Sequence, residues 1–252
     1  IKQIFNRNEI MSTPLTQYDV LNGALALIFV IISLLVGIRI FFKYFTLKRS
    51  ELITVGLAWI FLSSGWWGAA FSFLSIIIFN YSMDPILYMF SGNIFLPVAV
   101  TCWIYSFASM VYPNIKNKIM MITLIICVPF EGYLIFLLIF NPNAIGTIIG
   151  VFYYRPNIYI LAFQIFAILI SFITGIMFSR RSLQSEDPKI RLKGKFLLIA
   201  FISFTLGAII DSSFAANSIT LVIARIILVL SAFEYYFGFL LPEKLADWLL
   251  NK

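Results

Sequence analysis

Long apolar segments alternate with short polar segments along this chain. Seven windows of mostly apolar residues recur, each bounded by charged residues or by turn residues such as Asn, Pro and Ser. A helix of ~20 residues crosses a hydrocarbon core of ~30 Å, so each window is long enough to span a membrane. The pattern predicts an all-α integral membrane protein, a bundle of seven helices at Tyr18–Phe42, Leu52–Phe79, Leu87–Met110, Ile119–Phe140, Asn157–Phe178, Phe196–Phe214 and Ile219–Leu241.

The segments on either side of the bundle are short and polar. Residues 1–17 form a polar tail that lacks the separate apolar stretch and cleavage site of a secretory signal. Residues 18–241 form the seven-helix domain, and no separate soluble catalytic module is expected. The tail 242–252 has apolar residues at helical spacing, which predicts a short amphipathic helix in the inner membrane interface: Leu245, Trp248 and Leu249.

Composition agrees with a lipid environment. Of the 252 residues 62% are apolar and 12% are charged, against about 45–50% and about 25% in soluble domains. Membrane lipids are therefore expected partners, and we expect the protein in the cell membrane. Cys102 and Cys127 fall inside predicted spans, where they are expected to pack as small apolar residues.

Basic residues predict the orientation of the bundle. The connections after the first, third and fifth spans are rich in Lys and Arg, whereas those after the second, fourth and sixth together carry one basic residue, Arg155. Such residues stay on the cytoplasmic side, so the N-terminus is expected outside and the C-terminus inside. The same bias explains the net charge of +7, and no nucleic-acid partner is indicated. The basic loop 179–195 is alternatively a docking surface for a cytoplasmic or membrane protein partner.

Residues needed for several kinds of catalysis are missing. The sequence has no histidine, which excludes a Ser-His-Asp triad and a His-based metal site. It also lacks a glycine-rich phosphate loop and paired-cysteine metal spacings. We therefore expect no enzymatic activity, no cofactor and no metal, while an intramembrane hydrolase or transferase stays an open alternative.

Ionisable side chains inside the predicted spans fall into two layers. At ~1.5 Å per residue, Asp211, Arg225 and Glu131 lie roughly 5–14 Å below the outer surface. Arg39 and Glu234 lie roughly 5–10 Å from the inner surface. An ionisable group costs at least ~2.5–3.5 kcal/mol at mid-span and is normally paired. We predict that Arg225 pairs with Asp211 or Glu131, and that Arg39 and Glu234 form a structural ion pair.

Further polar and aromatic groups share the outer layer, which predicts a ligand pocket open to the outside. Asn93 and Gln164 lie roughly 9–11 Å below the outer surface. The predicted ligand-binding residues are Trp66, Trp67, Asn93, Glu131, Gln164, Asp211 and Arg225. The alternative is interhelical packing, in which an Asp211–Arg225 bridge joins two helices, Arg39 extends alone to the head groups and the tryptophans form an interfacial belt.

Three stretches carry a resemblance to a known class: GLAWIFLSSGWWGAAFSFL in the second span, SGNIFLPVAVTCWIYSF in the third, and RIILVLSAFEYYFGFLLPEKLADWL at the end of the seventh. They resemble the prokaryotic, especially archaeal, seven-helix sensory modules found ahead of cytoplasmic transmitters. The resemblance implies a receptor-like sensor for an exterior or lipid-borne ligand. Such sensors usually continue into a coiled coil and an output domain, whereas this sequence stops at Lys252, so a separate cytoplasmic partner is expected to receive the signal.

Two other functions stay open. The protein is alternatively a non-catalytic subunit of a larger membrane assembly, with its charges fixing helix contacts. It is also alternatively a small-solute or proton transporter that uses Glu131, Asp211 and Arg225 as a path. Many transporters are built from repeated halves, and no internal repeat is evident in seven spans, which favours the sensor and the subunit.

Overall fold

The structure, a computed structural model, describes residues 15–214 and 217–250. Most of the predicted polar tail, residues 1–14, lies outside the described residues. The prediction of seven membrane-spanning helical segments is confirmed, because each predicted window coincides with a helical segment of suitable length and hydropathy. Four of these segments are single helices over nearly their whole length: α1 (Gln17–Leu47), α7 (Ile158–Leu183), α8 (Pro188–Phe214) and α9 (Ser218–Leu240).

The other three segments are interrupted or preceded by short elements. The second consists of α2 (Glu51–Leu62), the 3-10 turn η1 (Ser63–Trp66) and α3 (Trp67–Phe79), and the third of α4 (Pro85–Asn93) and α5 (Leu96–Val111). The fourth is η2 (Pro113–Ile115) followed by α6 (Lys116–Phe140). After α6 come η3 (Pro142–Ala144), β1 (Gly146–Ile149) and β2 (Tyr153–Pro156), and the described chain ends with α10 (Glu243–Leu250).

Side-chain caps begin several helices at the predicted places. The Thr16 hydroxyl accepts a hydrogen bond from the backbone N–H of Asp19 at 3.1 Å, and the Asp19 carboxylate accepts one from the Thr16 N–H at 3.0 Å. Asn157 and Asn217 cap α7 and α9. The side-chain oxygen of each accepts a hydrogen bond at 2.9 Å from the backbone N–H three residues later. Such caps satisfy N–H groups that have no partner within the helix. The positions of these polar residues therefore set where the apolar helices begin.

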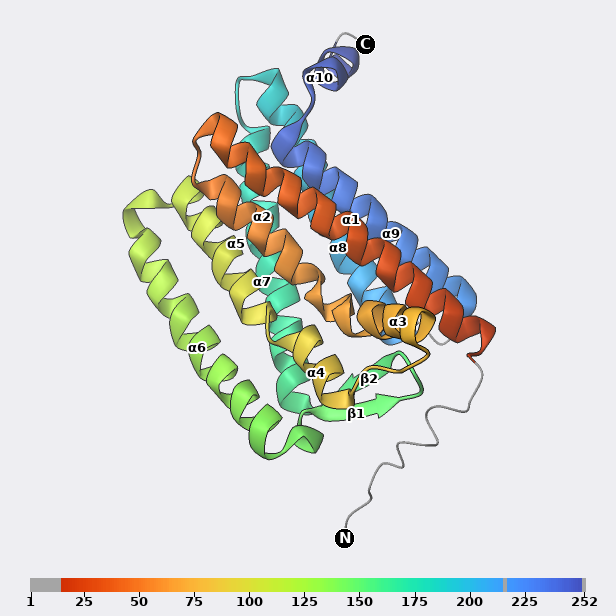
Figure 1. Ribbon diagram of the computed structural model, residues 1–252. Helices are drawn as coiled ribbons and strands as arrows, with labels where there is room; N and C mark the ends of the chain where they lie inside the picture. The colour runs from red at the N-terminus through yellow and green to blue at the C-terminus, as the bar shows by residue number, and fades with distance from the viewer. Residues whose placement is uncertain (1–14, 215–216, 251–252) are drawn as a thin grey trace.

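Spans two and three break in the same half of the molecule. The run SSGW adopts a 3-10 turn, so α3 leaves the direction of α2 (Figure 1). Span three breaks after Asn93, where Pro97 in the first turn of α5 cannot donate a backbone hydrogen bond. A Cβ added to Gly92 would lie 4.0 Å from the carbonyl oxygen of Gly65. The two breaks therefore face each other across the bundle interior.

A β-hairpin that the sequence reasoning did not predict covers the end of the bundle near α4. Strands β1 and β2 pair antiparallel, with Thr147 opposite Arg155. Gly150 adopts a left-handed φ of 67° between the strands, a conformation that costs glycine little. A lone hairpin is marginal in water, but here Phe152 is buried against Phe73, with ring centroids 5.9 Å apart. We call this end of the molecule the hairpin end.

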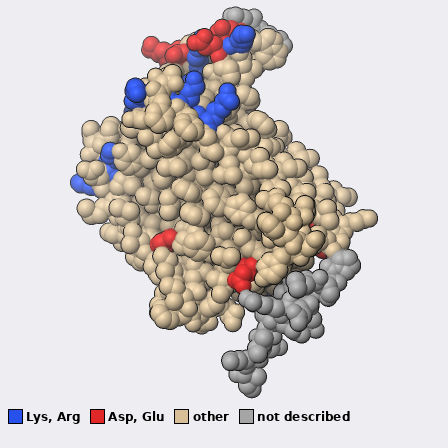
Figure 2. Space-filling view, viewed as in Figure 1, with Lys and Arg blue, Asp and Glu red and all other residues tan. Residues whose placement is uncertain are grey.

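The opposite end carries α10 and most of the basic side chains. Figure 2 shows Lys and Arg gathered below and beside α10, which lies at the far end of the bundle from the hairpin in Figure 1. The predicted C-terminal helix is present as α10, and Lys189 of α8 lies 3.3 Å from Asp247 of α10. We call this end the α10 end. The connections that hold the basic residues therefore share one side of the bundle.

Candidate ligand cavity

A cavity of about 350 Å³ lies in the hairpin half of the bundle. Every spanning segment except the fourth contributes to its wall, through α1, α2, η1, α3, α4, α5, α7, α8 and α9, and β2 contributes as well. The volume lies within the ~300–1,000 Å³ typical of small-molecule sites. Five of the seven predicted ligand-binding residues line it: Trp66, Asn93, Gln164, Asp211 and Arg225.

The most buried charge in the cavity wall is Arg225, which is 4% exposed. Its Nε lies 3.1 Å from Asp211 Oδ1, so Asp211 is the partner found among the two that the sequence predicted. Trp66 Nε1 donates to the other carboxylate oxygen of Asp211 at 2.7 Å, and Arg225 Nη2 donates to Asn22 Oδ1 at 3.1 Å. This cluster joins α8 and α9 to α1 and to the 3-10 turn of the second span.

Two nitrogens of the Arg225 guanidinium, Nε and Nη1, make no hydrogen bond within the described residues, although Nε lies beside Asp211 in the ion pair. Nη1 is buried and has no hydrogen-bond partner among the residues that the structure describes. A buried donor without a partner costs about 1–3 kcal/mol, and more when it is charged. Asp211 balances the charge of Arg225, but the hydrogen-bonding capacity of Nη1 is unused.

A pair of amides forms another part of the wall. Gln164 Nε2 donates to Asn93 Oδ1 at 2.9 Å, and Asn93 Nδ2 donates to the carbonyl oxygen of Met89 at 2.8 Å. Asn93 is only 1% exposed. These bonds join α7 to the broken end of α4 and fix the orientation of both amides. The cavity thus has fixed polar groups on two of its sides.

Tyrosines attach the hairpin above the cavity. Tyr88 donates through its hydroxyl to the carbonyl oxygen of Phe152 at 3.0 Å, and Tyr154 donates to the carbonyl oxygen of Ile145 at 3.0 Å. Burial raises the pKa of Tyr154, so its hydroxyl keeps the proton that it donates. Both tyrosines line the cavity. The hairpin is therefore bonded to α4 as well as to its own neighbours in sequence.

The sequence reasoning missed Asn22, Tyr88 and Tyr154 as cavity residues. Asn22 is a buried amide inside an apolar window, and its depth, counted as for Asn93, would have placed it in the same layer. Nothing in the pattern distinguishes Tyr88 and Tyr154 from other aromatic residues. Their place depends on the hairpin, which the sequence reasoning treated as a connection.

Trp67 and Glu131 are not part of the cavity wall, contrary to the prediction. Trp67 follows Trp66 directly, so it points to another side of the chain, where it donates to Ser63 Oγ at 3.1 Å and contacts Phe95. Glu131 is on α6, which packs mainly against α5 at the edge of the bundle (Figure 1). Its Oε2 atom is buried and lacks a hydrogen-bond partner within the described chain. The depth count did not give the direction in which either side chain points.

The predicted ion pair between Arg39 and Glu234 is not formed. Within the described ranges the salt bridges are Arg225–Asp211 and Lys189–Asp247. Arg39 lies on the exposed face of α1, whereas Glu234 is half-buried on α9. The two residues share a depth in the membrane, but the rotation of their helices turns them to different surroundings.

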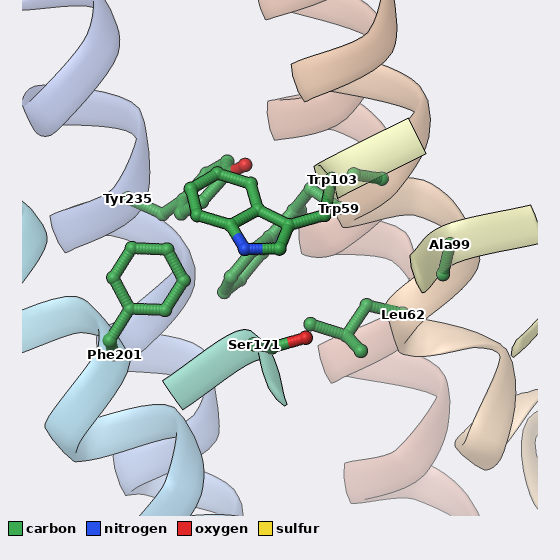
Figure 3. A pocket seen from close by; sticks show the side chains of 8 residues that line it. Trp59, Leu62, Ala99, Trp103, Ser171, Phe201 and Tyr235 are labelled. Carbon is green, nitrogen blue, oxygen red and sulfur yellow. The ribbon is translucent and has the colours of Figure 1, made fainter. Parts of the chain in front are cut away.

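A layer of packed aromatic side chains closes the cavity toward the α10 end (Figure 3). Trp59 stacks on Tyr235 with ring centroids 4.2 Å apart, and the Tyr235 hydroxyl donates to the carbonyl oxygen of Val55 at 3.3 Å. Trp103 and Phe201 complete the layer, with ring centroids 4.9 Å apart. The remaining space within it is about 10 Å³, roughly enough for one water molecule. The cavity therefore has a packed floor.

No protein-family model matches this chain, and no curated protein matches it either. The residues around the cavity are therefore the basis for a functional proposal.

Proposed function

We propose that this chain is a receptor-like membrane sensor that binds a small ligand in the cavity of the hairpin half. The ligand is exterior or lipid-borne, and the bound state is relayed to a separate cytoplasmic partner. The observation that carries the proposal is the cavity of about 350 Å³ whose wall contains a buried arginine with an unused donor. No catalytic step is part of the proposal.

A purely structural role for Arg225 does not account for the space beside it. A bridge that only joins α8 to α9 works best when the surrounding side chains fill the bundle, as they do in the aromatic floor. Instead Arg225, Asp211, Asn93 and Gln164 all border one open volume. Convergent polar groups on an otherwise apolar cavity are typical of a ligand site.

The positive-inside rule supports an orientation with the hairpin end outside. Basic residues in short connections remain in the cytoplasm, and here they gather at the α10 end (Figure 2). In this orientation the cavity lies in the outer half of the membrane. A partner would then dock on the basic surface of residues 179–195, which the structure forms from the end of α7, the connection 184–187 and the start of α8.

The broken helices provide a route for the relay. Trp66 in η1 donates a hydrogen bond to Asp211, and Asn93 at the end of α4 accepts one from Gln164, so both breaks contact polar residues of the cavity wall. Interrupted helices bend at their breaks more easily than continuous ones. A ligand that changes these contacts would therefore shift α3 or α4 relative to α2 and α5.

The packed floor of the cavity argues against the transporter alternative. A transporter needs a path to the other side of the membrane, and here Trp59, Trp103 and Tyr235 fill the bundle below the cavity. The subunit alternative has one observation in its favour. The buried Oε2 atom of Glu131 on the peripheral helix α6 lacks a partner in the described chain, and a second membrane protein would supply one.

A ligand screen tests the proposal. The purified protein in lipid nanodiscs is heated with lipids, retinoids, amphipathic acids and small metabolites, and any hit is examined by native mass spectrometry. We expect a specific stabilisation that the paired variant Arg225→Gln with Asp211→Asn loses. The matched control, Lys189→Gln with Asp247→Asn, removes an ion pair outside the cavity and should keep it. No stabilisation by any compound, with co-purification of a stoichiometric protein, would instead support the subunit.

A further inference from the structure

Two residues of the cavity wall, one on α7 and one on α8, are also exposed at the surface of the molecule. Leu161 of α7 is 38% exposed and Ser212 of α8 is also exposed, yet both line the cavity. Both lie within about 6 Å of the hairpin ends of their helices, at 1.5 Å per residue. Side chains that border an internal space and the surface at once mark an entrance.

The same two helices are in close contact nearer the α10 end. A Cβ added to Gly175 of α7 would lie 2.4 Å from the ring of Phe201 in α8, and one added to Gly194 of α8 would lie 2.9 Å from Ser182 of α7. In the hairpin half, the facing residues Ile168 and Ala208 instead border the cavity. The two helices are therefore in close contact nearer the α10 end, and both border the cavity nearer the hairpin end.

The charges that border the cavity are unequal. Two arginines, Arg155 and Arg225, are set against one carboxylate, Asp211, among the described lining residues. Arg155 is exposed on β2, near the entrance, and Arg225 is deep with its Nη1 donor unused. One positive charge is in excess, which suits a ligand with a single negative charge. Oxyanions form the strongest hydrogen bonds with arginine.

Apolar side chains form most of the remaining wall. Leu96, Phe204 and Leu221 are each less than a tenth exposed and border the cavity together with Ile168 and Leu161. Such a surface favours an apolar ligand body, because burial there removes hydrocarbon from water or packs it against close neighbours. A cavity of about 350 Å³ admits one chain or ring system.

We infer that the ligand is an amphiphile with one carboxylate and one apolar chain or ring system, which enters from the outer membrane leaflet between α7 and α8. Its carboxylate binds the Arg225 side chain, and its apolar body lies toward Leu161 and Ile168. Arg155 attracts the head group at the entrance. This inference rests on the proposed function and adds the chemical class and the route of entry.

Dodecanoate and dodecan-1-ol are the probes that test the inference. They have the same chain, so any difference reports the carboxylate. Each is added to the full chain in phosphatidylcholine nanodiscs, and binding is followed by native mass spectrometry and by thermal stabilisation. We expect one dodecanoate per protein, bound on the order of tenfold more tightly than the alcohol, because a charge-assisted hydrogen bond is gained. Equal binding of the two probes would overturn the carboxylate assignment.

The route is tested by closing the entrance. Leu161→Trp should weaken dodecanoate binding at least tenfold, whereas Ile165→Trp, one turn along α7 and 48% exposed but outside the cavity wall, should leave it within about twofold. Ser212→Trp closes the same entrance from α8 and serves if the first variant does not fold. Benzoate supplies a carboxylate from water. Tight benzoate binding that both tryptophan variants leave unchanged would overturn the membrane route.

The failure of this inference is distinguishable from that of the proposed function. If dodecanoate does not bind but another class of compound stabilises the protein through Arg225, the inference is wrong and the sensor proposal stands. If no compound of any class binds, both are contradicted.

Discussion

Arg225 is buried and Asp211 is mostly buried, and each has a second polar neighbour besides the other. Asp211 accepts from Trp66, and Arg225 donates to Asn22. In a membrane interior such bonds matter because water is not available to replace them. Removing one charge therefore leaves the other without its counter-ion.

Single and paired substitutions in this cluster should differ sharply. Arg225→Gln is expected to destabilise the protein by about 3–5 kcal/mol, because Asp211 stays buried without its counter-ion. Adding Asp211→Asn should recover much of the loss. Chemical unfolding in detergent measures both variants, and equal stability of the single and paired variants would contradict the expectation. The exposed pair Lys189–Asp247 is the control, where neutralising both residues should cost no more than about 1 kcal/mol.

Depth along a helix limited the predicted partner of Arg225 to Asp211 or Glu131, and the partner in the structure is Asp211, which lies close to the turn that joins α8 to α9. Depth was not enough for Glu131 or for the Arg39–Glu234 pair. Those contacts require knowledge of which helices are neighbours and how each is rotated, and neither follows from hydropathy. The same count of depth would have placed Asn22 in the outer polar layer.

At the level of elements, the glycines of the second span position the cavity wall. A Cβ added to Gly68 would lie 2.9 Å from the ring of Tyr88, whereas one added to Gly65 would meet nothing within 4 Å. Gly68 therefore allows α3 and α4 to approach closely. Gly65 borders the cavity itself.

Gly68→Leu should displace Tyr88 and weaken the hairpin end. Overpacking of this kind costs roughly 1–3 kcal/mol, and the hydrogen bond from Tyr88 to Phe152 would be strained or lost. Gly132→Leu is the control, since a Cβ there meets nothing within 4 Å. Thermal unfolding of the two variants checks this, and equal midpoints would show that the α3–α4 contact is not tight.

The hairpin should open more often when its bond to α4 is removed. Tyr88→Phe deletes the donor to the Phe152 carbonyl, and a bond worth about 0.5–1.5 kcal/mol corresponds to roughly 2–12-fold faster amide exchange in the hairpin. Hydrogen–deuterium exchange over residues 146–156 measures the change. Tyr133→Phe, at an exposed position of α6, should leave exchange there unaltered. Unchanged exchange in Tyr88→Phe would mean that packing alone fixes the hairpin.

The sequence predicted all seven spanning segments because long apolar runs have few other stable structures. It did not predict the hairpin, whose strands are four residues each and depend on packing against Phe73 and Tyr88. Hydropathy did not predict the breaks after Leu62 and Asn93, although Pro97 in the third window is a residue type that interrupts a helix. Both interruptions lie within continuous apolar windows, where hydropathy gives no signal.

At the scale of the whole molecule, the two ends of the bundle differ in charge and in packing. The α10 end has the basic connections and a filled interior, whereas the hairpin end has the cavity. The proposed function requires the hairpin end to face outward. That requirement is open to a direct test.

Labelling of single cysteines should give the orientation. In a background with Cys102→Ala and Cys127→Ala, Ile149→Cys places an exposed thiol in the hairpin, and Glu186→Cys places one between α7 and α8. A membrane-impermeant maleimide added to intact cells should label Ile149→Cys and not Glu186→Cys, until the membrane is permeabilised. The reverse pattern would place the cavity in the inner half of the membrane.

The most direct test of the central claim is to fill the cavity without disturbing its charges. Gly65→Phe directs a ring into the cavity from a position where a Cβ meets no neighbour within 4 Å, and Gly132→Phe is the matched change on α6, away from the cavity. The measurement is the thermal shift produced in each folded variant by the compound that most stabilises the unmodified protein in the screen. Loss of the shift in Gly65→Phe, with retention in Gly132→Phe, is the predicted result. A shift that persists in Gly65→Phe would show that the cavity is not the ligand site.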